Sequence, residues 1–334
     1  MKRKTALVAG GAAVAAVAAV VVPRLVERRL LGATDHHADD PVGIPPDALH
    51  HHLDLADGGE LHVVERGPMG ARPLVLLHGI TLAAAAWGYQ LRDLAGAFRV
   101  VAPDLRGHGE SRPGTAGHGI GPIASDVAEL LEQLDLRDAI VVGHSMGGMV
   151  LQRVAQEHLD VLDARAAGLV FLSTTPGPPV PAPFHQTIDR LASRVSGVGR
   201  TRAWRRAGGL PKGSAGTFAT TLAFGRDPSA SHVLATKGWL HAMDPESTWA
   251  TGVSLGTHRG IAGLRAWRGP ALVIVGSRDL ITPVRFSRII AGELRDAHLE
   301  VLPGCGHMTM LERHDELGAL LEAFAARLPV RAQS

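Results

Sequence analysis

The segment VVGHSMGG, residues 141–148, places three glycines around a single serine directly after a β-branched run. Glycine weakens regular elements, so a cluster of glycines indicates a backbone that turns sharply or that another segment approaches closely. The apolar residues before this segment favour a strand, and the periodic residues 146–158 after it favour a helix. A strand, a tight turn and a helix would hold Ser145 at the turn, so Ser145 is the candidate nucleophile.

Composition limits what the rest of the chain can be. The chain has 334 residues, of which 46% are hydrophobic and 20% charged, enough for one large α/β domain with an insertion or for two domains. The net charge of +2 and the lack of a basic stripe exclude a nucleic-acid-binding protein. The single cysteine, Cys305, excludes an intramolecular disulfide and is expected to be buried and inert. We expect no metal site, since His36, His37 and His50–His52 lack partners at ligand spacing, and no organic cofactor.

The N-terminal region has the pattern of a targeting segment. Residues 2–4 are basic, residues 5–22 carry no charge, and Pro23 ends the run. We therefore expect residues 1–23 to be a signal anchor or transmembrane segment, with the catalytic domain outside the cytoplasm. Secretion after signal cleavage and a helix of the soluble domain are the alternatives. Residues 24–49, rich in Pro, Gly, Asp and His without periodicity, are expected to be a linker.

Strand-like and helix-like segments alternate from about residue 50. Residues 50–66 have the pattern of a hairpin, and short apolar strands are expected near 72–79, 98–103, 139–144, 167–174, 270–279 and 298–304. Helical periodicity lies between these strands, which predicts a parallel sheet wound with right-handed crossovers. We assign residues 50–177 and 269–334 to the two parts of this core.

The alternation stops at residues 178–268. This stretch holds four of the five tryptophans and has a net charge of +8, with ten Arg and two Lys against three Asp and one Glu. Several helix-like pieces broken by glycine replace the strands. An insertion of this length in a compact domain is expected to form a helical cap or lid.

Five motifs arrive in a fixed order along the chain: LLHG at 76–79, DLRGHGES at 104–111, GHSMGG at 143–148, GSRD at 276–279 and GCGHM at 304–308. Together they resemble the α/β-hydrolase fold superfamily, and within it the cap-bearing serine esterase or lipase-like branch. The resemblance covers about residues 50–330. It implies an α/β fold with a mostly parallel sheet flanked by helices and a helical cap inserted before the acid-bearing strand.

The resemblance also implies a catalytic triad in the order serine, acid, histidine. Ser145 would be the nucleophile, Asp279 the acid that orients the base, and His307 the base itself. The strand before the cap ends in FLSTTPG, which has no carboxylate, so the superfamily's other position for the acid is vacant. His314 is the nearby competitor for His307, and we expect it to be exposed at the start of the final helix.

Backbone N–H groups of Ile80 and Met146 would form the oxyanion hole. His78 and His144 are interpreted as packing or hydrogen-bonding residues rather than catalysts. In the DLRGHGES motif, Asp104 and Arg106 are expected to belong to a buried polar network.

These residues predict a serine hydrolase that cleaves a carboxylic ester, apolar or lipid-like, through an acyl-enzyme intermediate. Reactions of the same triad remain as alternatives: cofactor-free haloperoxidase-like perhydrolysis, carbon–carbon bond hydrolysis, amide hydrolysis and acyl transfer. A non-catalytic hydrolase-like binding protein is the alternative from a different class. The expected partners are a small-molecule ester and, through the N-terminal segment, a membrane.

Overall fold

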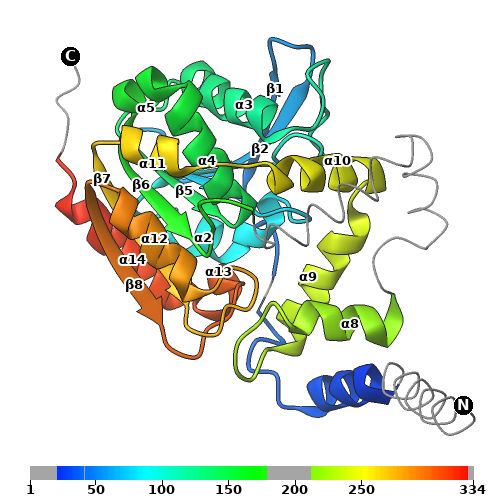
Figure 1. Ribbon diagram of the computed structural model, residues 1–334. Helices are drawn as coiled ribbons and strands as arrows, with labels where there is room; N and C mark the ends of the chain where they lie inside the picture. The colour runs from blue at the N-terminus through cyan, green and yellow to red at the C-terminus, as the bar shows by residue number, and fades with distance from the viewer. Residues whose placement is uncertain (1–20, 41, 179–211, 330–334) are drawn as a thin grey trace, which may run out of the picture.

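The computed structural model describes residues 21–40, 42–178 and 212–329, and its centre is an eight-stranded sheet (Figure 1). The strand order is β1-β2-β4-β3-β5-β6-β7-β8. The pairs β1–β2 and β2–β4 are antiparallel, and all the other pairs are parallel. The strands are β1 (Leu49–Asp54), β2 (Glu60–Arg66), β3 (Pro73–Leu77), β4 (Arg99–Pro103), β5 (Ala139–His144), β6 (Ala166–Leu172), β7 (Pro270–Gly276) and β8 (Asp296–Leu302).

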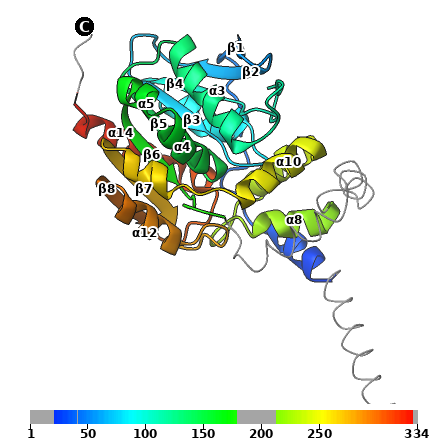
Figure 2. The same cartoon turned by 45° about the horizontal axis from the view of Figure 1, so that its top comes forward.

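Helices cover both faces of this sheet (Figure 2). One face packs against α3 (Ile120–Gln133), α4 (Met146–Glu157), α5 (Leu159–Arg165), α11 (Ile261–Ala266) and α12 (Val284–Glu293). The other face packs against η1 (Ala84–Trp87), α2 (Gly88–Asp93), α13 (Thr309–Glu312) and α14 (His314–Arg327). The wholly apolar strands follow from this arrangement, because successive side chains point to opposite faces and both faces are buried. Along β3, for example, Leu74 belongs to one core cluster and Val75 to the other.

Among the helices described between β6 and β7 in the chain, three lie apart from the sheet: α8 (Gly213–Thr221), α9 (Ala230–Ala242) and α10 (Pro245–Gly256) (Figure 1). They occupy the place in the chain where a helical cap was predicted. The predicted fold class, a mostly parallel sheet flanked by helices with this insertion before β7, is confirmed. Residues 179–211 of the predicted cap lie outside the described residues.

The predicted membrane anchor is corrected by the structure. In the part of the chain that is described, no helix has the length and apolar character needed to cross a bilayer. Residues 21–32 form a helix that contains the charged residues Arg24, Glu27, Arg28 and Arg29. This finding contradicts the predicted transmembrane anchor and the localisation derived from it, and it leaves the predicted membrane partner without support. Residues 1–20 of the predicted segment lie outside the described residues.

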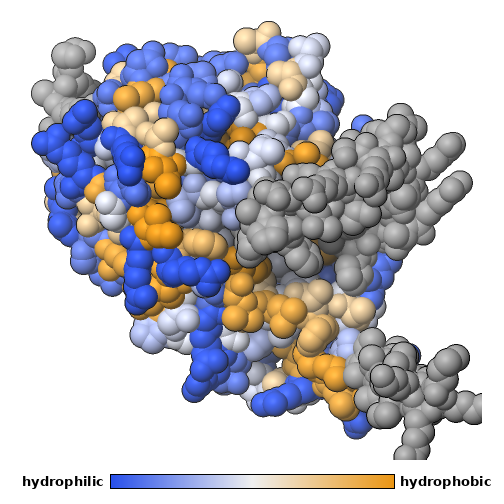
Figure 3. Space-filling model, viewed as in Figure 1, coloured by the Kyte–Doolittle hydropathy of each residue, from blue (hydrophilic) through white to orange (hydrophobic). Residues whose placement is uncertain are grey.

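The helix at residues 21–32 and the turns after it contact the cap. Glu27 accepts hydrogen bonds from the hydroxyls of Ser214 and Thr217, the latter at 2.8 Å. Asp35 accepts one from Ser229 Oγ and one from the backbone N–H of Ser231, both at 2.7 Å. Figure 3 shows apolar side chains beside this helix and α8 at the lower right of the molecule. The region predicted as a linker is thus attached to α8 and α9.

The loop of the DLRGHGES motif is held by buried charges. Asp104, 3% exposed, accepts hydrogen bonds from His62 Nδ1 at 2.8 Å and from the backbone N–H of Ala84 at 2.7 Å. Arg106, 2% exposed, forms ion pairs with Asp126 at 2.5 Å and with Asp57 at 2.6 Å. This network joins the loop to the β1–β2 turn and to α3.

We expect Arg106→Leu to lower the free energy of unfolding by about 3–5 kcal/mol, because it leaves the buried carboxylate of Asp126 without its cation. Urea unfolding measures this loss. Arg137→Leu, which breaks an ion pair with Asp135 whose two side chains are 65% and 63% exposed, is the control and should change stability by about 0.5 kcal/mol or less. Equal losses in the two variants would contradict the assignment of a buried network.

Candidate active site

Four of the sequence-predicted site residues lie in loops at one edge of the sheet. Ile80 follows β3, Ser145 follows β5, Asp279 follows β7 and His307 follows β8. Because the carboxyl ends of parallel strands meet at the same edge, the fold brings these loops together. Ile80, Ser145 and His307 line one cavity of about 220 Å³, and Asp279 contacts His307.

The backbone at Ser145 has a conformation that side chains rarely adopt. Its φ is 53° and its ψ is −114°, so the chain reverses between the last residue of β5 and the first residue of α4. The backbone N–H of Ser145 donates to the carbonyl of Leu172 on β6 at 3.0 Å. The hydroxyl of Thr174 donates to the Ser145 carbonyl at 2.6 Å. Contacts from β6 and the residues after it therefore hold this strained turn in place.

The glycines around Ser145 are required by close contacts. A Cβ at Gly143 would lie 2.5 Å from the carbonyl oxygen of Gly147, and one at Gly147 would overlap the carbonyl of Leu77. A Cβ at Gly148 would lie 2.6 Å from the side chain of Thr174. The turn therefore packs directly against β3 and the segment after β6, which explains the glycine spacing seen in the sequence.

Asp279 and His307 form a buried pair. The Nδ1 atom of His307 lies 2.9 Å from Oδ2 of Asp279. His307 is 5% exposed and Asp279 is 3% exposed. Asp279 also accepts hydrogen bonds from the backbone N–H groups of Ile281 and Thr282, at 2.9 and 2.8 Å, and from the Thr282 hydroxyl at 2.7 Å. The carboxylate is thus fixed on both oxygens.

The surroundings of Asp279 keep it ionised. Burial by itself raises the pKa of this carboxyl, but His307 and the hydrogen bonds from Thr282 outweigh burial and hold the pKa below its ordinary value. In a neutral imidazole, an ionised Asp279 favours the tautomer of His307 that carries its proton on Nδ1, with Nε2 facing away from the carboxylate as an acceptor. This is the tautomer that a general base needs.

Ser145 and His307 face the same cavity from neighbouring loops. Between these two described residues the structure contains no hydrogen bond, and in enzymes without substrate such contacts are often long until a complex forms. The backbone of His307 is held by two further contacts. Its N–H donates to the carbonyl of Ala223 in the cap at 2.7 Å, and its carbonyl accepts from Nε2 of His144 at 3.0 Å.

Two buried histidines support the predicted oxyanion loop. His78 accepts the backbone N–H of Leu105 on Nε2 at 2.9 Å, so its Nδ1 carries the proton and donates to the carbonyl of Gly79 at 2.8 Å. Burial lowers the pKa of His78, and burial together with nearby His307 lowers the pKa of His144 to about 3. Both rings are neutral at pH 7. Met146, whose N–H is the second predicted donor, is the first residue of α4, and this residue is 1% exposed.

Comparisons with known proteins agree with this architecture. A family model described as "Alpha/beta hydrolase family" matches residues 74–320. The chain belongs to the alpha/beta hydrolase family. Among its relatives is a non-heme chloroperoxidase of Burkholderia pyrrocinia, 28% identical over 284 residues that cover 80% of this chain and 96% of the relative.

A second relative and a solved structure point the same way. The non-heme chloroperoxidase CPO-A1 of Kitasatospora aureofaciens is 30% identical over 257 residues, covering 75% of this chain and 90% of the relative. An esterase from Exiguobacterium antarcticum has the same fold, with a TM-score of 0.71 and 20% identity over 83% of this chain and all of that one. The resemblance read from the five motifs is confirmed at the level of the family.

Sequence reasoning missed three residues that position the site of this alpha/beta hydrolase. Thr282 donates a hydrogen bond to Asp279, and Thr174 donates one to the carbonyl of Ser145. Glu312 accepts hydrogen bonds from the backbone N–H groups of Gly306 and Met308, on either side of His307. Thr282 stands three residues after Asp279, a spacing typical of a side chain that caps its own loop, and could have been found. Glu312 and Thr174 had no local signal.

His314, the predicted competitor of His307, and Cys305 do not line the cavity of Ser145. His314 is not exposed as expected: its side chain is 12% exposed, and its ring stacks on Tyr89 with centroids 3.9 Å apart. Burial raises the pKa of the Cys305 thiol to about 12, so the thiol stays protonated at neutral pH. Among the described residues, His37, Asp40 and His314 bring ligand atoms within 4.8 Å of one another and could share a metal ion, but this cluster lies outside the cavity of Ser145.

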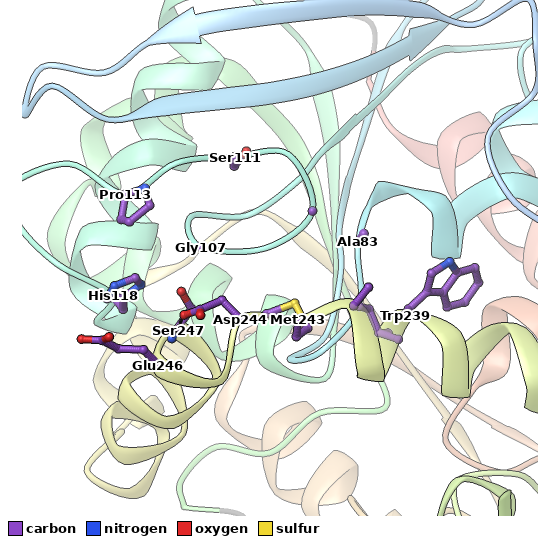
Figure 4. Close-up of a pocket in the computed structure, with 13 residues that line it drawn as sticks. Ala83, Gly107, Ser111, Pro113, His118, Trp239, Met243, Asp244, Glu246 and Ser247 are labelled. Carbon is purple, nitrogen blue, oxygen red and sulfur yellow. Dashed lines mark hydrogen bonds between the residues drawn. The ribbon is translucent and has the colours of Figure 1, made fainter. Parts of the chain in front are cut away.

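A second, larger cavity of about 470 Å³ lies beside the first, and Leu82 lines both. Figure 4 shows its lining residues on the 104–111 loop, at the end of α9 and at the start of α10. His118, Asp244, Glu246 and Ser247 gather at one end of it (Figure 4). The hydrolase thus has an apolar cavity at Ser145 and a more polar one next to it.

We expect Ser145→Gly to be more stable than Ser145→Ala by about 1 kcal/mol, because glycine adopts a positive φ without strain. Urea unfolding of the two variants checks this difference. Ser125→Gly and Ser125→Ala, inside α3, are the control pair, for which the order should reverse because alanine stabilises a helix interior and glycine weakens it. A more stable Ser145→Ala would show that the turn is unstrained.

Four buried histidines predict acid sensitivity. Burial is the main cause that lowers the pKa of His108 and His144 to about 3 and of His232 and His258 to about 4. Below pH 6.5 the unfolded chain binds a proton at each of these positions, whereas the folded chain does not until pH 3–4. The contribution of these four histidines to the free energy of unfolding is therefore complete above pH 6.5 and is lost as the pH decreases below this value.

Each proton bound on unfolding gives a slope of about 1.4 kcal/mol per pH unit. Near pH 5, four such protons should therefore lower the free energy of unfolding by about 5 kcal/mol for each unit by which the pH decreases. Urea unfolding between pH 7.5 and 5 measures the slope. His258→Gln should reduce it by about 1.4 kcal/mol per pH unit, whereas His241→Gln, at an exposed position, should leave it unchanged. A flat profile would contradict neutral buried histidines.

Proposed function

We propose that this alpha/beta hydrolase is a serine hydrolase that cleaves an apolar or lipid-like carboxylic ester through an acyl-enzyme intermediate. The observation that carries the proposal is the buried Asp279–His307 pair, whose base shares a cavity with the strained Ser145. A nucleophile, a base and a group that orients the base are the three parts that acyl transfer to serine needs. The cavity lining, mostly apolar with Leu82, Leu240 and Met308 among its residues, favours an apolar substrate.

In the first half of the proposed reaction, His307 Nε2 takes the proton of Ser145 as its Oγ attacks the ester carbonyl. The backbone N–H groups of Ile80 and Met146 stabilise the oxyanion, aided by the positive end of α4. The ionised Asp279 stabilises the imidazolium that forms on His307. His307 then gives this proton to the leaving alcohol, and the acyl group remains on Ser145.

In the second half, His307 takes a proton from water as the water oxygen attacks the acyl-enzyme. The tetrahedral intermediate collapses, the carboxylic acid leaves and the proton returns to Ser145. We further propose that residues 178–268 form the lid of this site. Its helices α8 and α9 supply Ala219, Thr220, Thr236 and Leu240 to the cavity.

A second candidate is favoured by the relatives named as non-heme chloroperoxidases. The same acyl-enzyme would be attacked by hydrogen peroxide in place of water, which releases a peroxy acid. The peroxy acid would then oxidise a halide outside the protein. This reaction uses Ser145, Asp279 and His307 in the same roles and needs no further group from the chain.

Hydrolysis of p-nitrophenyl esters from acetate to palmitate by the full chain tests the first proposal. The cavity of about 220 Å³ has room for roughly seven water-sized groups, so kcat/KM should be highest between butyrate and octanoate. Ser145→Ala should lower kcat by about 10⁴-fold or more, and Asp279→Asn by about 10⁴-fold.

The same preparations, given acetate, bromide and hydrogen peroxide, separate the two candidates. Hydrolysis without peroxide-dependent bromination supports the esterase, and efficient bromination with poor ester turnover supports perhydrolysis. A folded chain that reacts with a fluorophosphonate at Ser145 but carries out neither reaction would contradict both. His241→Gln, at an exposed position in the cap, is the control variant and should leave all rates unchanged.

A further inference from the structure

Two histidines and an aspartate from distant parts of the chain meet at the start of α14. His37 and Asp40 lie in the turns that follow the helix at residues 21–32, and His314 is the first residue of α14. Each of the three offers one ligand atom, and these atoms lie within 4.8 Å of one another. In the sequence His37 has no partner at ligand spacing, whereas the fold supplies one from the start of the last helix.

The two imidazole rings of this cluster are held by stacking. The ring of His37 stacks on that of His232 in α9, with centroids 4.6 Å apart. The ring of His314 lies parallel to that of Tyr89, with centroids 3.9 Å apart. The Tyr89 hydroxyl lies 2.8 Å from Nε2 of His232, so the two supporting rings are joined to each other. Neighbouring groups that fix the orientation of ligand rings are typical of metal sites.

The charges around the cluster favour a cation. The carboxylates of Asp93 and Asp315 offer oxygen atoms that, together with a ring nitrogen of His314, lie within 4.8 Å of one another. Arg92 is a basic neighbour of Asp40 and His314, but it forms an ion pair with Asp93 at 2.7 Å. With Arg92 balanced by Asp93, the negative charges of Asp40 and Asp315 attract a further cation to this cluster.

The cluster is open to an ion from solvent, because the side chains of His37 and Asp40 are 32% and 42% exposed. Nδ1 of His37 and Oδ2 of Asp40 are 2.8 Å apart. Two ligand atoms on a tetrahedral zinc ion lie about 3.3 Å apart, since each is about 2.0–2.1 Å from the ion. Small rotations of these two partly exposed side chains therefore allow an ion to replace the proton that they share.

The donor set selects the kind of ion. Imidazole nitrogen suits zinc and related transition metals, and a carboxylate oxygen completes many zinc sites. Calcium and magnesium ions are bound mainly by oxygen atoms, so a set with two imidazoles disfavours them.

We propose that His37, Asp40 and His314 form a binding site for a divalent transition-metal ion, for which Zn²⁺ is the probe, and that water completes the coordination. The ion ties the turns after the helix at residues 21–32 to the start of α14, next to the cap helix α9. This site is separate from Ser145, and the proposal does not depend on the reaction proposed there.

Calorimetric titration of the full chain with ZnCl₂, after removal of bound metal with a chelator and without an affinity tag, tests the proposal. One Zn²⁺ per chain should bind, with a Kd of about 1 μM or lower at pH 7.5. His37→Gln, Asp40→Asn and His314→Gln should each raise the Kd at least about tenfold, because even the loss of a group that only supports a ligand has an effect of this size. CaCl₂ should bind at least about 100-fold more weakly.

His36→Gln and Asp39→Asn are the matched controls, because each replaces an exposed residue directly before a proposed ligand. Their Kd values should stay within about twofold of the wild-type value. Adventitious binding by surface histidines would change equally in the ligand and control variants, or in neither. Either result would overturn the proposal, as would a wild-type chain that binds no Zn²⁺.

Thermal unfolding distinguishes a lost site from a misfolded variant. At about 100 times the Kd, ZnCl₂ should raise the Tm of the wild type and of both controls by about 3–5 °C, because the ion binds the folded chain. Without zinc, His37→Gln and Asp40→Asn should unfold near the wild-type Tm, since both side chains are partly exposed. Zinc should leave the Tm of these two variants unchanged, and an increase equal to that of the wild type would contradict the assigned ligands.

Discussion

The backbone conformation of Ser145 is the constraint on which the site depends. A positive φ at a residue with a side chain costs energy, and it persists where surrounding contacts fix it. Here the β6 carbonyl at Leu172, the Thr174 hydroxyl and the close approach of Gly147 to β3 supply those contacts. This turn places Ser145 above the edge of the sheet, and α4 begins at the next residue. The parallel sheet is thus the support that makes the turn possible.

The loops around this turn are held by buried polar groups rather than by apolar packing. Asp104 and His78 fix the loops after β4 and β3, while Glu312 binds the backbone on both sides of His307. Buried hydrogen bonds are directional, so they define the positions of loops more sharply than apolar contacts do. Buried histidines such as His108 and His144 also make the protein sensitive to acid, since they remain uncharged in the folded state.

The helices inserted between β6 and β7 shape the cavity at Ser145. Residues of α8 and α9 line it, and Ala223, which follows α8, accepts the backbone N–H of His307. Residues 21–40, which precede the core, bind these helices through Glu27 and Asp35. The cavity is therefore built from the core and the inserted helices, and the N-terminal region contacts these helices.

The sequence by itself determined the order of strands and helices, the turn at Ser145 and the loops that hold Asp279 and His307. These features depend on local signals: apolar runs of strand length, glycines at a tight turn, and polar residues that directly follow strands. Local signals failed for the N-terminal segment, where the helix at residues 21–32 meets the cap through Glu27, and for His314, which stacks on a distant tyrosine. Only the tertiary structure decided the bond between Asp279 and His307 and the support that Glu312 gives to the backbone on both sides of His307. Each of these depends on side chains that the fold brings together or keeps apart, and a single sequence has no signal for such distances.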